Sequence, residues 1–128
     1  MAIARDTTAS NIKPLAGAIV RRYTTGTAVA AGEIVHLETD GYVDPAVVSG
    51  SAVDEAIGIA VQADAVGGAV VDVVVFGPVK CLTGAEEGGT VFTSASAGEP
   101  TQTDASYLTA VGYAESATVL FVLPEHLA

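Results

Sequence analysis

Short apolar runs separated by glycine-containing turns fill most of the chain after residue 17. In the run EIVHLE, which starts at Glu33, successive side chains alternate between two faces, a period of two that is typical of a half-buried strand. Only residues 46–55 are compatible with a short helix, and Gly50 weakens it. The runs that predict strands are residues 18–24, 33–38, 42–43, 56–61, 70–76, 78–82, 90–93, 108–114 and 118–123. About eight or nine short strands with frequent turns predict an all-β fold, a small barrel or sandwich.

Two patterns recur along the chain at nearly the same offset. The pattern Thr-x4-Gly-x2-Val begins at Thr27 and again at Thr83, an offset of 56 residues. The pattern Ala-x-Gly-x-Ala-x2-Ala begins at Ala56 and again at Ala110, an offset of 54 residues. Glycine and alanine on an inner face allow strands to approach closely or a sheet to bend sharply. The sequence therefore predicts a weak internal repeat.

The first 16 residues have no periodic apolar pattern. They include Lys13-Pro14, where the proline restricts the preceding residue to extended conformations. We predict an extended N-terminal arm over residues 1–16 and one β-domain over residues 17–128. The alternative is a disordered terminus without a task, as most termini are.

The composition fits one domain. A chain of 128 residues is long enough for one domain and short for two. No run approaches the 18 or so uninterrupted apolar residues of a membrane helix, and the start lacks the basic and apolar regions of a secretory signal. We therefore expect no membrane partner. The single cysteine, Cys81, cannot form an internal disulfide and is expected to be a small buried apolar residue.

The net charge of −10 is unevenly distributed. Four of the five basic residues, Arg5, Lys13, Arg21 and Arg22, lie in the first 22 positions, where Asp6 is the only acid. That segment carries +3 and the rest of the chain carries −13. An acidic body repels phosphate backbones, so we expect no nucleic-acid partner.

Catalytic motifs are nearly absent from the sequence. The two histidines are His36, in an alternating strand, and His126, near the end, and nothing local supports a nucleophilic pair of Cys81 with His36. No serine-hydrolase, zinc-protease, zinc-finger or phosphate-loop motif occurs. The adjacent Glu86 and Glu87 lie in a glycine turn without partners for acid–base catalysis. We expect a protein that is not an enzyme and has no cofactor.

Scattered acids raise the question of a cation site. Four aspartates could in principle hold a hard cation, but their spacing matches no calcium loop, and we expect no metal. They are Asp40, Asp44, Asp54 and Asp64. For a small ligand-binding barrel, the best polar group that the sequence offers is His36 with Tyr42 or Tyr113.

An ordered series of segments extends over residues 17–124. The segments are GTAVAAGEIVHL from Gly26, AIGIA from Ala56, VVDVVVFGPV from Val70, GGTVFT from Gly88 and VGYAESATVLFVL from Val111. In this order they resemble a family of small capsid cement proteins of tailed bacteriophages. The N-terminal arm has no counterpart in that pattern, so its role is not inherited from the resemblance.

The resemblance implies a compact β-barrel or β-tulip domain, often a homotrimer, without catalytic residues. Such a protein decorates the outer surface of the virion, bound between capsomers of the expanded head. The expected partner is the major capsid protein. The expected function is mechanical, because contacts that bridge neighbouring capsid subunits oppose the pressure of the packaged DNA.

Residues 1–22 are the segment that we expect to fasten the protein to the capsid. Basic side chains would meet an acidic capsid surface, and apolar ones would fill shallow sites. The basic residues are Arg5, Lys13, Arg21 and Arg22, and the apolar ones are Ile3, Ile12 and Leu15. A chain lacking residues 1–16 is then expected to fold but not to bind. The alternative for Arg21 and Arg22 is that both belong wholly to the first strand, with side chains on opposite faces.

Two further function classes remain open. A head–tail joining or tail protein would share the all-β, small-residue composition, but it would assemble as a ring at one vertex. A small ligand-binding barrel would need a pocket lined by convergent polar groups. Copy number per particle and a ligand screen distinguish these classes from a decoration protein.

Overall fold

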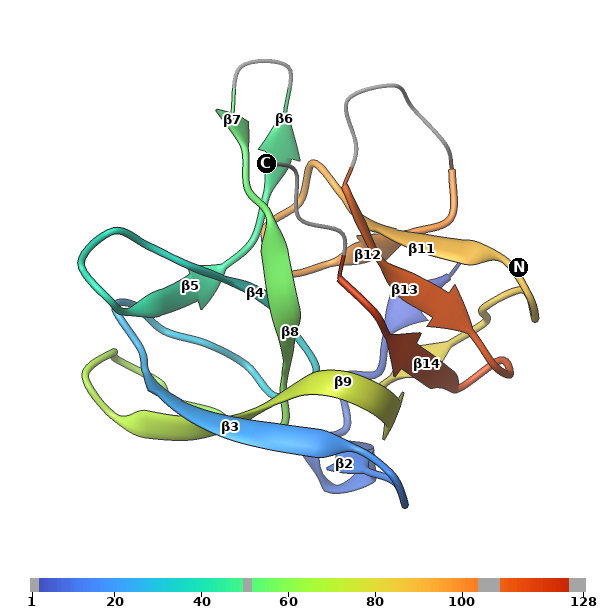
Figure 1. Ribbon diagram of the computed structural model, residues 1–128, viewed down its shortest axis with the longest axis horizontal. Coiled ribbons are helices and arrows are strands. Elements are labelled where there is room, and N and C mark those ends of the chain that lie inside the picture. The colour runs from blue at the N-terminus through green and yellow to red at the C-terminus, as the bar shows by residue number, and fades with distance from the viewer. Residues whose placement is uncertain (1–2, 50–51, 104–108, 125–128) are drawn as a thin grey trace.

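The computed structural model describes residues 3–49, 52–103 and 109–124 (Figure 1). Almost all regular structure in these ranges is β, and the helix they contain is the short 3-10 turn η1 (Ala9–Asn11). The strands are β1 (Ala4–Arg5), β2 (Lys13–Pro14), β3 (Ile19–Thr24), β4 (Ile34–Leu37), β5 (Val43–Pro45), β6 (Val48–Ser49), β7 (Ala52–Val53), β8 (Ala56–Ala60), β9 (Val70–Lys80), β10 (Leu82–Thr83), β11 (Thr90–Thr93), β12 (Pro100–Thr101), β13 (Ala110–Ala114) and β14 (Val119–Val122). The all-β prediction is confirmed.

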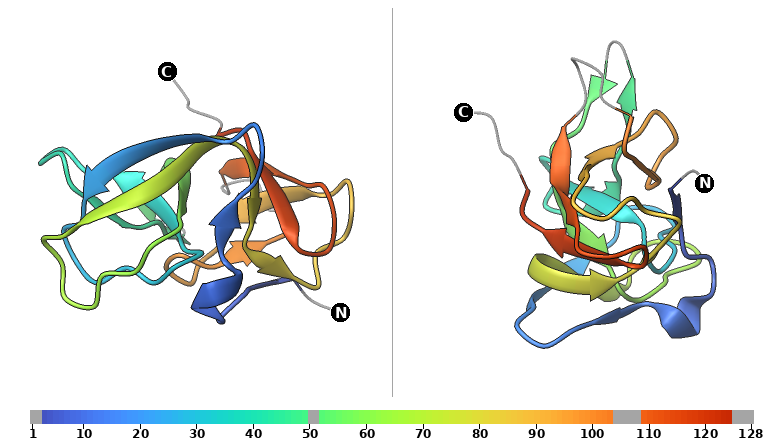
Figure 2. Two further views of the ribbon diagram at one scale, coloured as in Figure 1. Left: turned by 90° about the horizontal axis from the view of Figure 1, so that it is seen from below. Right: turned by 90° about the vertical axis from the view of Figure 1, so that its right-hand side faces the viewer.

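One antiparallel sheet of ten strands organises the domain. Its main path runs β12-β11-β13-β14-β9-β8-β4-β5, and β2 and β3 also pair with β9. The sheet curls into a half-barrel, as the two turned views show (Figure 2). No helix within the described ranges is long and apolar enough to cross a membrane.

Strand β9 joins the two halves of the sheet. Its first half pairs with β3 and β8, and its second half pairs with β14 and β2. The sequence predicts two strands here, residues 70–76 and 78–82, whereas the structure has one strand running through Gly77. That residue has φ +101°, and a side chain there would crowd the backbone of Gly17 and Ala18. Glycine at position 77 therefore allows the backbone of Gly17 and Ala18 to pass close to β9.

Apolar residues on both faces of the central strands fill two adjoining cores. On β4, Ile34 belongs to one core and Val35 to the other, and Val74 and Val73 divide in the same way on β9. All four side chains are at most 1% exposed. The centre of the valine-rich run of β9 is therefore covered on both faces, which reduces the aggregation hazard of an exposed β-strand.

The predicted internal repeat is visible in the strand pairing. Val35 on β4 lies opposite Gly58 on β8, and Val91 on β11 lies opposite Gly112 on β13; each ladder has a β-bulge directly after that pair. The N–H of Gly32 donates to the carbonyl of Ala60, and the N–H of Gly88 donates to that of Ala114. One unit contains β3, β4, β5, β8 and the first half of β9; the other contains the second half of β9, β11, β12, β13 and β14.

The N-terminal segment is docked on the domain and not free. β1 pairs with β10, β2 pairs with β9, and the N–H of Leu15 donates to the carbonyl of Pro78. Ile12 is 6% exposed and belongs to the first core. The expected boundary at residue 16 therefore coincides with no break in the packing of the described residues.

Residues 46–55 contain two short strands where the sequence leaves room for a helix. β6 and β7 pair with each other. The N–H of Val47 donates to the Asp54 carboxylate, and the N–H of Asp54 donates to the carbonyl of Val47. These bonds link the two ends of the segment, which a helix over the same residues would hold apart.

Candidate interaction surface

Four of the five basic side chains lie on three neighbouring strands. Lys13 is on β2, Arg21 and Arg22 are on β3, and Lys80 is on β9. The fifth, Arg5, is engaged within the domain: its Nε donates to Glu99 Oε2 at 2.7 Å and its Nη1 donates to the carbonyl of Ala31 at 3.2 Å. The charge asymmetry seen in the sequence therefore places four basic residues on β2, β3 and β9, the part of the sheet that we call the basic side.

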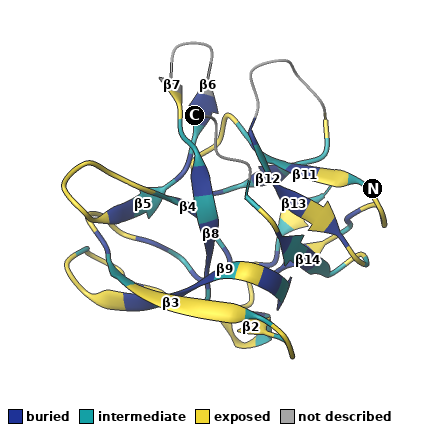
Figure 3. Ribbon diagram, in the orientation of Figure 1, coloured by how far each residue is buried: buried dark blue, intermediate teal, exposed yellow. Residues whose placement is uncertain are grey.

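Strand β3 supplies the most exposed part of this side, drawn in yellow in Figure 3. Among the described strands, β3 pairs only with β9. Arg22 Nε lies 3.4 Å from Asp72 Oδ1, and the Arg22 side chain stays 74% exposed. Arg21 is also exposed. Both arginines belong to the first long strand, the alternative that the sequence left open, and alternation along a strand directs them to opposite faces.

Two lysines face each other beside β3. Lys13 on β2 lies directly opposite Lys80 on β9 in the antiparallel register. Like charges in directly opposite positions are destabilising in a sheet. Asp6 supplies a negative charge near Lys80, and Lys13 is exposed to solvent, where it could meet an anionic partner.

An aromatic group adjoins the basic side. The ring of Phe76 meets that of Phe121 edge-on at 5.3 Å between centroids, and Tyr113 stacks on Phe121 at 5.2 Å. Ile19 lies opposite Phe76 in the register of β3 and β9. Ile19 is 53% exposed and Phe76 is 40% exposed, whereas side chains of this kind are usually buried.

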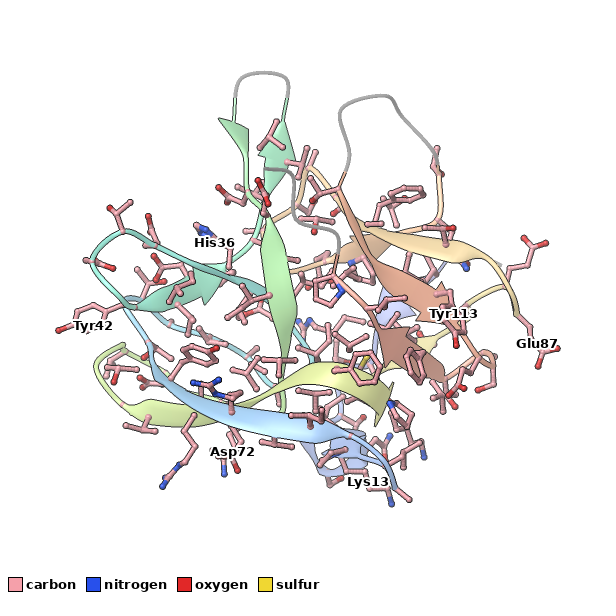
Figure 4. All side chains as sticks on the ribbon, viewed as in Figure 1. Lys13, His36, Tyr42, Asp72, Glu87 and Tyr113 are labelled. Atoms are coloured by element: carbon pink, nitrogen blue, oxygen red, sulfur yellow. The ribbon has the colours of Figure 1, made fainter. Side chains whose placement is uncertain are left out.

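We call these residues together the basic–aromatic face, a name that covers both sides of β3, because Arg21 and Arg22 point in opposite directions from that strand. It consists of Lys13, Ile19, Arg21, Arg22, Phe76, Lys80, Tyr113 and Phe121. Exposed aromatic and apolar side chains next to arginines are typical of protein-binding surfaces. Figure 4 labels Lys13 and Tyr113, which belong to this face, and Asp72, the partner of Arg22.

The structure divides the site residues expected from the sequence into two groups. Lys13, Arg21 and Arg22 are exposed on the basic–aromatic face. Ile12 is in the core and Arg5 is paired with Glu99, while Ile3 and Leu15 are half-buried, with Ile3 packed on the core. From the sequence we expected all seven of these residues to contact the capsid. The structure differs, because most of their side chains already pack or form hydrogen bonds within the domain.

Several residues of the face were missed at the sequence level. Lys80, Phe76, Phe121 and Tyr113 lie in apolar strands, where the sequence does not show which face of the sheet is covered. Phe76 is three residues from each of the buried Val73 and Val79, so strict alternation would place its side chain on the opposite face of β9. The β-bulge in the pairing of β3 with β9, between Ile19 and Val20, interrupts that alternation. The outward orientation of these side chains therefore follows from the register of the paired strands and not from the composition of the strands.

A second group of ionisable side chains lies on β4 and β5, away from this face. His36 Nε2 is 3.4 Å from Asp54 Oδ2. Glu38 shares a side-chain hydrogen bond with Asp44, which raises the pKa of the Glu38 carboxyl, and the negative charge of Asp44 adds to the effect. Two carboxyl groups joined by a hydrogen bond share a proton more readily than isolated ones.

Asp64 is buried and has a structural role. Thr25 Oγ1 donates to Asp64 Oδ2 at 2.6 Å, and the N–H groups of Ala69 and Val66 donate at 3.0 and 3.1 Å. These hydrogen bonds, that of Thr25 first, lower the pKa of the Asp64 carboxyl to about 2. The carboxylate thereby ties the loop before β9 to the end of β3.

Cys81 cannot act as a nucleophile in the folded protein. Its side chain is 0% exposed, and burial raises the pKa of the thiol to about 12. The reactive species is the thiolate, which such an environment suppresses. The expected role of a small buried residue is confirmed.

The residues proposed for a ligand pocket do not converge. His36 and Tyr42 lie on one half of the molecule, and Tyr113 lies on the other, stacked on Phe121 (Figure 4). An open depression of about 410 Å³ is lined mainly by alanines and contains none of the three. Its two carboxylates, Glu33 and Asp64, already accept backbone hydrogen bonds. The described residues therefore give little support to a ligand-binding barrel.

Comparison with known proteins leaves the family open: no protein-family model matches the sequence, and no curated protein matches it.

Proposed function

We propose that the chain is a non-enzymatic capsid decoration protein of a tailed bacteriophage, bound as a homotrimer to the outer surface of the expanded head. The observation that carries the proposal is the basic–aromatic face on a molecule whose net charge is −10. The resemblance of residues 17–124 to capsid cement proteins supplies the partner, the major capsid protein.

The face suits a protein partner that is acidic and partly apolar. Lys13, Arg21 and Arg22 would approach carboxylates, and Phe76 with Phe121 would contact apolar side chains. Exposed ion pairs contribute only about 0.2–1 kcal/mol each, so one face binds weakly. Three faces on a trimer act together, and the effective concentration raises the avidity by about 10²–10⁴.

The fold suits a mechanical role. Strand β9 belongs to both halves of the sheet, so a load applied to one half passes to the other through continuous backbone and two buried cores. A protein that bridges neighbouring capsid subunits needs this rigidity more than a catalytic cleft.

Co-sedimentation with purified heads tests the proposal. The protein is mixed with expanded and unexpanded heads of the phage that encodes it, and the bound copies per particle are counted. Saturable binding of many copies to expanded heads is the expected result. Binding of about one ring per particle would replace the proposal with a vertex or tail component. No binding to either form would overturn the virion assignment altogether.

A further inference from the structure

We propose that His36, Glu38 and Asp44 form a binding site for a divalent transition-metal cation such as Zn²⁺. One ligand atom from each of the three side chains lies within 4.8 Å of the other two. The inference does not depend on the capsid function, because the three residues lie on β4, just after it and on β5, and none belongs to the basic–aromatic face.

Strand pairing brings the three side chains together. His36 on β4 lies directly opposite Asp44 on β5. Glu38 follows His36 by two residues and so has the same orientation on the strand. The N–H of Glu38 donates to the carbonyl of Tyr42, which extends the pairing beyond the end of β4. The candidate ligands therefore stand on a hydrogen-bonded two-strand unit and not on a loose loop.

A carboxylate lies beside His36, as it does at many metal-binding histidines. Its Nε2 lies 3.4 Å from Asp54 Oδ2, and that oxygen also accepts the N–H of Val47 at 3.0 Å. A carboxylate on one ring nitrogen fixes the tautomer of the ring and leaves the other nitrogen as a ligand. The His36 side chain is 15% exposed, and Glu38 beside it is exposed to solvent.

The other half of the protein shows that the fold does not require these residues. By the register of the repeat, Phe92 takes the place of His36 and Thr101 takes the place of Asp44. Ser94, whose N–H donates to the carbonyl of Glu99, takes the place of Glu38. The second unit therefore builds the same strands with an aromatic residue and two hydroxyls.

Within the described ranges, no lysine or arginine forms an ion pair with Glu38 or Asp44, and the basic group that acts on Glu38 is His36 of the same cluster. In the described ranges the ion pairs that involve an arginine are Arg5–Glu99 and Arg22–Asp72. Asp44 Oδ1 accepts a hydrogen bond from Thr27 Oγ1 at 3.1 Å, which leaves its negative charge in place. A bound cation would supply the missing positive charge.

The donor set selects the class of metal. One imidazole and two carboxylates match zinc and related transition metals, whereas Ca²⁺ and Mg²⁺ prefer six or more oxygen ligands or several waters. Tetrahedral zinc with bonds of about 2.0–2.2 Å sets its ligand atoms about 3.4 Å apart. The three ligand atoms, which lie within 4.8 Å of one another, would have to draw closer by about 1 Å, and a water would complete the fourth position.

Isothermal titration of the full chain with ZnCl₂, and separately with CaCl₂, tests the site. The wild type is expected to bind one zinc per chain and to bind calcium at least tenfold more weakly. The informative variant is His36→Phe with Glu38→Ser and Asp44→Thr, which installs the residues of the other half and should preserve the fold. This variant is expected to lose zinc binding by more than tenfold.

Two controls separate the site from general attraction to an acidic protein. Glu86→Gln with Glu87→Gln removes two exposed carboxylates elsewhere and should leave zinc affinity unchanged. His126→Ala removes the histidine that lies outside the described residues and should also leave it unchanged. Absence of saturable zinc binding by the wild type would overturn the proposal, and so would undiminished binding by the folded triple variant.

Discussion

Gly58 and Gly112 occupy the same position in the two halves of the sheet. Each faces the carbonyl oxygen of the adjacent strand, that of Val74 for Gly58 and that of Phe121 for Gly112, so closely that a Cβ atom would collide with it. Each also lies opposite a buried valine, Val35 or Val91. The repeat therefore preserves a close backbone contact and not merely a similar composition.

Substitution of either glycine by alanine is expected to destabilise the fold. The added methyl group meets rigid backbone in both halves, so Gly58→Ala and Gly112→Ala should each lower the free energy of unfolding by about 1–3 kcal/mol or more. Urea denaturation measures the change. Gly89→Ala is the control, because the nearest atom there is the movable side-chain amide of Gln102. Equal losses at all three positions would contradict the explanation.

The N-terminal segment is expected to contribute to stability. Ile12→Ala removes a side chain that is 6% exposed from the first core and should cost about 2–4 kcal/mol of unfolding free energy. Val66→Ala, at a side chain that is 84% exposed, should cost close to nothing. If thermal and urea unfolding do not distinguish the two variants, residues 3–16 are not docked in solution as described.

The docking of the N-terminal segment on the domain changes how capsid binding should be tested. Deleting residues 1–16 would remove Ile12 from the core and β2 from the edge of β9, so a loss of binding could reflect a damaged fold. Substitutions on β3 avoid the problem, since Arg21 and Arg22 are exposed.

Arg21→Gln with Arg22→Gln is expected to weaken head binding about tenfold without changing the unfolding midpoint appreciably, because exposed charges contribute little to stability. Binding by the wild type should also weaken as salt is raised. The control Ala95→Asp with Ala97→Asp shifts the net charge by the same amount at an exposed turn away from β3. Equal weakening by both variants would show that net charge matters and the position of the arginines does not.

The lowered pKa of the Asp64 carboxyl predicts that the protein loses stability in acid. Its folded-state pKa of about 2 lies below its ordinary value of 3.8, so its ionised form stabilises the native state above pH 4. That contribution declines as the pH falls from about 4 through 2. Asp64→Asn should therefore be less stable than the wild type at pH 7, and the difference should shrink on acidification. Glu87→Gln, at an exposed side chain, should show no such convergence in urea titrations at pH 7, 4 and 3.

The sequence predicts the strands better than their partners. Alternation and the glycine patterns locate β3, β4, β8, β11, β13 and β14 to within one or two residues and identify the repeat. The patterns do not show that residues 70–80 form one strand, because a glycine followed by a proline, Gly77-Pro78, normally indicates a break in a strand. The patterns also do not show where the N-terminal segment lies, because its pairing with β9 and β10 joins residues more than 60 positions apart.

The candidate sites were predicted only in part, because they too depend on strand pairing that local sequence patterns do not show. Charge counting identifies Lys13, Arg21 and Arg22, since segregated basic residues are visible in a one-dimensional sequence. The proximity of His36 to Asp44 depends on the pairing of β4 with β5, and Glu38 joins them because it follows His36 by two residues. A search by spacing for a calcium loop therefore misses it.

The most direct test of the capsid function is the stability of DNA-filled heads. Heads freed of this protein are heated with and without the purified wild-type chain, and DNA release is followed by a dye that cannot enter intact particles. The account predicts that saturating protein raises the release temperature, and that the Arg21→Gln, Arg22→Gln variant requires a higher concentration for the same effect. An unchanged release temperature at full occupancy would show that the protein binds the head without reinforcing it and would contradict the central claim.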